Sequence, residues 1–135
     1  MKRTRTTNNE VQKKRDIDRC EYRLKLNNKK LLQFKEYIVI NHDTWCSKSW
    51  DIDTYYEYIP TNLVDVNQHR LTNDCGYEDK DLLQMLYDIT DACAYLQRSS
   101  FDHGVIRPEY IAVDQAGHYI LCDHLLEGGN FDVNV

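Results

Sequence analysis

The chain has 135 residues, of which 41% are hydrophobic and 29% are charged, and its formal net charge is −5 at pH 7. This length allows one small domain, and the composition excludes a wholly disordered chain. No stretch approaches the roughly 20 consecutive apolar residues of a membrane-spanning helix, so no membrane partner is expected.

The charge is unevenly distributed along the chain. Residues 1–15 carry six Lys or Arg side chains against Glu10 alone, so this segment is basic and the remainder is strongly acidic. We therefore expect residues 1–13 to form a basic extended arm that binds an acidic surface or stays solvated. A nucleic-acid partner is the weaker alternative for this arm, because the acidic body would repel it.

The cysteine pattern predicts reduced thiols in a cytoplasmic protein, because five widely spaced cysteines contain no Cys-x-x-Cys pair. Residues 118–124 contain two His, one Cys and one Asp, but their spacing matches no common zinc pattern. We expect neither a metal nor a cofactor.

The first half of the chain predicts a helix followed by a pair of strands. Charged residues interspersed with apolar ones at three- and four-residue steps predict a helix over about residues 10–26. Aromatic and β-branched side chains dominate residues 33–40 and 52–59, which predicts two antiparallel strands. The connection between them holds Trp45 and Trp50, and we expect both to cover the strand pair.

The strongest helix signal begins at Asp79 and extends to Gln97. The side chains expected to face the core are Leu82, Leu86, Ile89, Cys93 and Leu96. Further apolar residues widen this stripe, namely Leu83, Met85 and Tyr87. Residues 111–113 and 119–121 flank a turn with a glycine and predict a short hairpin, and residues 127–135 are expected to be a tail.

Several motifs together resemble a eukaryotic protein kinase. Residues 103–114, His-Gly-Val-Ile-Arg-Pro-Glu-Tyr-Ile-Ala-Val-Asp, resemble the kinase catalytic loop, which reads His-Arg-Asp-Leu-Lys-Pro-Glu-Asn before an apolar strand. Residues 121–125 resemble the strand that leads into the Asp-Phe-Gly motif, and residues 56–60 resemble the hinge. Residues 27–34 resemble the link between the regulatory helix and the fourth strand.

The resemblance implies an α+β, partial protein-kinase-like fold over residues 14–126. It would contain the regulatory helix, a hairpin, the hinge, the long C-lobe helix and a small hairpin, with both lobes incomplete. The two predicted strands would then lack their neighbours, which leaves an open sheet edge. The absence of the C-terminal kinase helices would likewise leave part of the apolar stripe with Leu83, Met85 and Tyr87 without cover.

The departures from the kinase pattern remove its chemistry. The positions of the catalytic base, the phosphate-contacting Lys and the magnesium-binding Asn hold Val105, Arg107 and Tyr110. The Gly-rich loop and the strand with the phosphate-pairing Lys are expected to be absent, and the helix acid that would pair with that Lys corresponds to Asp18 or Glu21. We expect no catalytic residue and no enzyme activity.

The function expected from the sequence is therefore non-catalytic: a pseudokinase-like fragment that serves as a structural or interaction subunit of a larger protein assembly. Other protein subunits would contact the basic arm, the open sheet edge and the long helix. The cytoplasm is the expected location, and a cytoskeletal or ciliary assembly is one setting.

Two alternatives remain open at this stage. A residual nucleotide-binding regulatory module would use Glu57 and Ile59 as an adenine-facing hinge and Asp123 as a cation ligand, all three being weak candidates. The chain could also be part of a longer kinase-like product.

Overall fold

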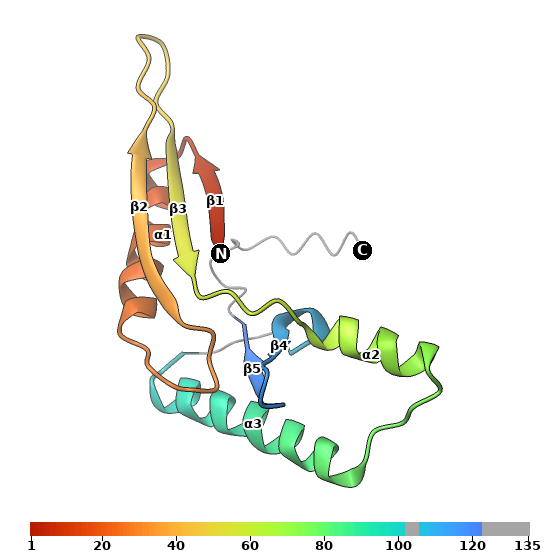
Figure 1. The fold of residues 1–135 in the computed structure, drawn as a ribbon. Coiled ribbons are helices and arrows are strands. Elements are labelled where there is room, and N and C mark those ends of the chain that lie inside the picture. The colour runs from red at the N-terminus through yellow and green to blue at the C-terminus, as the bar shows by residue number, and fades with distance from the viewer. Residues whose placement is uncertain (102–105, 123–135) are drawn as a thin grey trace. The chain divides into compact units, whose positions relative to one another are not determined.

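The computed structural model describes residues 1–101 and 106–122, which form two compact units (Figure 1). The first unit contains residues 1–27 and 33–57, and the second contains residues 28–32 and the described residues from 58 onwards. Helices and small antiparallel sheets make up the described chain, so the α+β class is confirmed. The chain divides within the stretch 14–126 that was expected to be one domain.

A three-stranded antiparallel sheet is the centre of the first unit, with β3 (Trp50–Tyr56) between β1 (Lys2–Thr7) and β2 (Phe34–Asn41). The β2–β3 hairpin confirms the predicted strand pair, although β3 ends at Tyr56. β1, by contrast, was not predicted.

The expectation of an extended arm over residues 1–13 is wrong. β1 pairs with β3 along its whole length, with Arg5 opposite Ile52. Met1 and Tyr56 exchange backbone hydrogen bonds of 2.7 and 2.8 Å. Of the first nine residues only Met1, Asn8 and Asn9 lie outside regular elements, because only two residues separate the end of β1 from the start of α1.

Acids on β3 explain why the basic N-terminal segment folds back onto the sheet. Lys2 Nζ lies 2.8 Å from a carboxylate oxygen of Asp53, and the hydroxyl groups of Thr4 and Thr6 donate 2.6 Å hydrogen bonds to Asp53 and Asp51. The hydrogen bonds from Lys2 and Thr4 lower the pKa of Asp53 below its usual value. The positive charge of Lys2, which suggested a solvated arm, is therefore balanced by Asp53 on the neighbouring strand β3.

α1 (Glu10–Leu24) confirms the first predicted helix and covers one face of this sheet (Figure 1). The side chain of Asn9 caps it by accepting hydrogen bonds from two backbone N–H groups of the first turn. Cys20 is buried beneath the helix, and the ammonium of Lys13 lies 4.3 Å from the ring centroid of Trp50.

The two tryptophans have different environments. Trp50 is buried in the sheet, as expected, whereas Trp45 at the tip of the hairpin is 98% exposed. The expectation that Trp45 covers the strand pair is wrong because the turn extends past the end of β1, where no helix packs on it (Figure 1).

The second unit contains α2 (Leu63–Thr72), α3 (Asp79–Arg98), the 3-10 turn η1 (Pro108–Tyr110), β4 (Ile111–Val113) and β5 (Tyr119–Leu121). β4 and β5 form the predicted small hairpin, in which Gly117 adopts a φ of +83° that glycine tolerates without strain. The segment before β2 joins this unit, because Leu31 forms a parallel bridge with Leu121.

α3 confirms the strongest helix prediction, and Leu96 is buried as predicted, but the expectation that Leu82 and Leu86 face the core is wrong. Asp88, Ala92 and Leu96 are buried, whereas Leu82 and Leu86 are 46% and 66% exposed. The side of α3 that faces the core is therefore the side that carries Asp88, and the leucines at the start of the helix lie on the solvent side.

Two leucine substitutions on α3 check this orientation. Leu96→Ala should lower the free energy of unfolding by about 3 kcal/mol, because it leaves a cavity in a packed core. Leu86→Ala should change it by less than about 0.5 kcal/mol, because the side chain is mainly in solvent. Denaturant unfolding of the full chain measures both, and equal effects would contradict the observed orientation.

Candidate functional site

The residues that resemble the kinase catalytic loop contribute mainly backbone contacts where they are described. Val105, like His103 and Asp123, lies outside the described residues. The N–H of Tyr110 donates to the carbonyl of Arg107 at 3.0 Å, which closes η1, and the carbonyl of Tyr110 accepts from Cys122 at 2.7 Å. Arg107 itself is exposed.

Glu57, a candidate hinge residue, is held at the base of the β2–β3 hairpin. Its Oε1 accepts a 2.8 Å hydrogen bond from the N–H of Gln33, and its own N–H donates to the carbonyl of Gln33 at 3.0 Å. The carboxylate therefore has a structural role in the first unit. Ile59 belongs to the second unit, where it lines a cavity of about 470 Å³ together with Tyr58 and Pro60.

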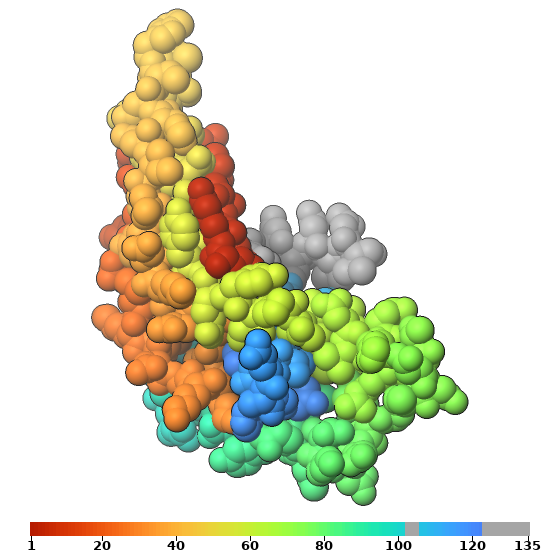
Figure 2. Space-filling view, viewed as in Figure 1, coloured from red at the N-terminus to blue at the C-terminus, as the bar shows by residue number. Residues whose placement is uncertain are grey.

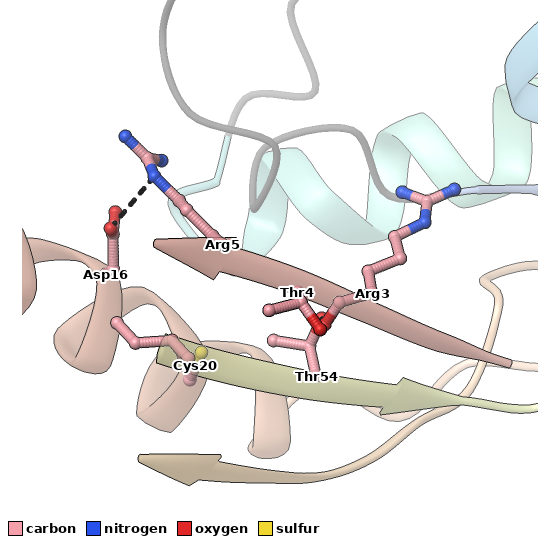
Figure 3. Close-up of a pocket in the computed structure, with 7 residues that line it drawn as sticks. Arg3, Thr4, Arg5, Asp16, Cys20 and Thr54 are labelled. Carbon is pink, nitrogen blue, oxygen red and sulfur yellow. Dashed lines mark hydrogen bonds and ion pairs between the residues drawn. The ribbon is translucent and has the colours of Figure 1, made fainter. Parts of the chain in front are cut away.

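A cavity of about 350 Å³ lies in the first unit between α1 and the β1 side of the sheet (Figure 3). It is lined by Arg3, Thr4, Arg5, Asp16, Cys20, Ile52 and Thr54. Arg5 Nε lies 3.2 Å from Asp16 Oδ2, and Asp16 is only 4% exposed. A strand cation is thus paired with a helix acid.

Two sequence-based expectations bear on this pair. The strand with the phosphate-pairing Lys of a kinase was expected to be absent, and the helix acid for that Lys was assigned to Asp18 or Glu21. In the first unit the helix acid that meets a strand cation is Asp16, which pairs with Arg5 of β1. Glu21 accepts a hydrogen bond from the hydroxyl of Tyr37, which raises the pKa of Tyr37 to about 12. The Arg5 signal was missed because the segment was interpreted as an arm.

The cavity presents two guanidinium side chains on one side of β1 (Figure 3). Arg3 lies over the ring of Tyr56, with 5.5 Å from its central carbon to the ring centroid. Nη1 of Arg5 is buried without a hydrogen-bond partner within the described residues. Such a group can donate a hydrogen bond to a small anion or a water molecule, although Asp16 already balances the charge of Arg5.

A buried carboxylate organises the second unit. Asp88 is 0% exposed and accepts hydrogen bonds from the ammonium of Lys30, from Gln84 Nε2 at 2.8 Å and from the N–H of Tyr119 at 2.9 Å. Burial raises the pKa of Asp88, but these donors outweigh it, so the pKa lies below its usual value. His118 Nδ1 lies 3.6 Å away and is half exposed.

The outward side of α3 carries an apolar surface that we name the α3 apolar face. It consists of Leu82, Leu83, Leu86 and Tyr87, which are 46%, 64%, 66% and 65% exposed. Leu83 and Tyr87 were expected to lack cover, and they do, whereas Met85 is half buried. Asp79 and Asp91 lie at the two ends of this face. An exposed cluster of this kind is typical of protein interfaces.

The described residues do not meet the requirements of a metal site, a disulfide or a membrane-spanning helix. Within residues 1–101 and 106–122 no three His, Cys, Asp or Glu side chains are placed to hold a metal ion. The five cysteines, all of them described, form no disulfide. No helix in the described part of the chain is long and apolar enough to cross a bilayer.

A scan against protein-family models finds no match.

Asp88→Asn should destabilise the protein by about 3 kcal/mol near neutral pH, because it leaves the ammonium of Lys30 without its buried counter-charge. The folded-state pKa of Asp88 is lowered, so its contribution is present above about pH 4 and is lost as the pH falls through the folded value. The difference between wild type and variant should therefore narrow below about pH 4. Denaturant unfolding across pH measures this, and Asp91→Asn, half exposed on the same helix, is the control.

Proposed function

We propose that the chain is a non-catalytic interaction protein, a degenerate kinase-like fragment that acts as a subunit of a larger assembly. The α3 apolar face carries this proposal, because its four large apolar side chains lie on one side of a 20-residue helix and are exposed. Exposed leucines of this kind contribute little to folding, so binding is the better explanation for them.

The order of the elements supports the kinase-like part of the proposal. A helix, a strand pair, a long helix and a small hairpin follow one another in the order that the motifs imply. The pair between Arg5 and Asp16 adds a strand cation that meets a helix acid, as the Lys and Glu of kinases do. Val105, Arg107 and Tyr110 support the absence of catalysis, because none supplies the acid, lysine or amide that phosphoryl transfer requires.

The partner that best fits the α3 apolar face is a helix with an apolar stripe and cationic residues at its ends. Apolar side chains at positions 82, 83 and 86 match the spacing of helix-on-helix packing. The flanking carboxylates of Asp79 and Asp91 favour positive charge on the partner.

The interaction can be tested by capture from a native extract with matched variants. Wild-type chain should retain a specific protein, and Leu83→Asp combined with Leu86→Asp should lose it, because two charges would be buried without partners. Leu71→Asp on α2, where the leucine is 80% exposed, is the control and should retain it. Equal capture by all three proteins would contradict the proposal.

A residual nucleotide-binding module is the second candidate, and the cationic cavity beside Asp16 is the observation in its favour. A thermal-shift titration with ATP and magnesium separates the two. We expect no change in Tm, because Asp16 already balances Arg5. A saturable rise in Tm that Arg5→Gln abolishes would support the nucleotide-binding alternative instead.

A further inference from the structure

The two edges of the three-stranded sheet differ in charge. At the β1 edge, every second residue bonds to β3, so the backbone groups of Lys2, Thr4 and Thr6 point away from the sheet. β1 also carries Arg3 and Arg5. Lys2 stays half exposed on this edge although it pairs with Asp53, and a lysine on an edge strand is a common way to protect that edge.

The β2 edge carries one lysine, Lys35, and this residue lies at the start of the strand. The N–H of His42 donates to the carbonyl of Ser49 at 2.8 Å, and from this pair every second residue of β2 bonds to β3. The intervening backbone N–H and C=O groups point away from the sheet, and they belong to Tyr37, Val39 and Asn41, while Lys35 lies at a register shift between Phe34 and Glu36. In Figures 1 and 2 this strand, drawn in orange, forms the margin of the sheet, with α1 behind it.

β2 also exposes apolar side chains on the face of the sheet opposite α1. Ile38 and Ile40 are 45% and 40% exposed, whereas Tyr37, on the other face, meets Glu21 of α1. An eight-residue edge strand with exposed isoleucines, and without Pro or Gly, is a site for strand pairing.

We propose that β2 pairs antiparallel with β2 of a second copy of this chain, about a twofold axis at Val39, so that the two sheets join into one of six strands. In this register Val39 lies opposite Val39 of the second copy, and Ile38 lies opposite Ile40 of the second copy. The four isoleucines then form one apolar patch across the axis.

Charge complementarity favours this register and a second copy as the occupant. The axis at Val39 sets Lys35 opposite Asp43 of the second copy, and Glu36 opposite His42 of the second copy, whose ring already lies 2.7 Å from Asp51 of its own β3. Symmetry doubles each pair. Lys35 and Glu36 are exposed, and neither forms an ion pair within the described residues. Moving the axis to Ile38 would set Lys35 opposite Asn41 and lose both pairs.

These exposed charges select the register more than they add affinity. The hydrogen bonds of the open edge and the isoleucine patch supply the binding. This interface uses the first unit alone and does not depend on the α3 apolar face.

A charge-swap series on the full chain tests the proposal. Sedimentation over a wide concentration range should show a reversible dimer, and Lys35→Glu or Asp43→Lys alone should weaken it about tenfold, because each creates two repulsive pairs. The double variant Lys35→Glu/Asp43→Lys should restore the wild-type dissociation constant. Lys48→Glu changes charge equally beyond the last pair and should have no effect.

Ile40→Lys should weaken the dimer by more than about a hundredfold, because it sets a charge against the isoleucine patch. Circular dichroism checks that each variant is folded. If Ile40→Lys fails to fold, the charge-swap variants of the exposed Lys35 and Asp43 still test the proposal. Leu86→Asp should dimerise as the wild type does. A monomer at every concentration, a dimer that no variant weakens, or a double variant that stays weakened would overturn the proposal.

Discussion

Hydrogen bonding of β3 on both of its edges is the interaction on which the first unit depends. Two strands alone are marginally stable in water, and β1 supplies the third. The pairing of a basic strand is possible because Asp51 and Asp53 project from β3 towards the side chains of β1. On the opposite face of the sheet, Asp16 of α1 forms an ion pair with Arg5 of β1. The basic N-terminal segment is thus largely neutralised within its own unit, which weakens any role for it in binding an acidic partner.

The second unit depends on a carboxylate in a similar way. An ionised group can be buried only if its hydrogen-bond capacity is filled, and Asp88 meets this condition with donors from three separate segments. This network fixes the rotation of α3 about its axis. With Asp88 facing inward, Leu83 and Leu86 must face outward. The α3 apolar face is therefore a consequence of a satisfied polar core, and no further packing is available to cover it within the described residues.

The two surfaces proposed for binding have different physical origins. The α3 apolar face offers area and a weak acidic rim, which suits a helix of another protein. The β2 edge offers backbone donors and acceptors and a self-complementary charge pattern, which suits a second copy. Neither requires the catalytic groups that the kinase resemblance lacks. The cavity beside Arg5 offers cationic groups that could meet a phosphate, but Arg5 is already paired with Asp16.

Local patterns in the sequence were sufficient to predict α1, the β2–β3 hairpin, α3 and the β4–β5 hairpin, because periodicity and turn chemistry act over a few residues. α2 was not predicted, since its few apolar residues form no single stripe. Only the tertiary structure decided that residues 2–7 form a strand, because Asp51 and Asp53, which accept hydrogen bonds from it, lie 45 or more residues away in the sequence. It also decided which side of α3 faces inward. Amphipathic spacing favoured the leucines, but a buried Asp88 with distant partners outweighed them, and the sequence alone does not specify which distant groups will meet.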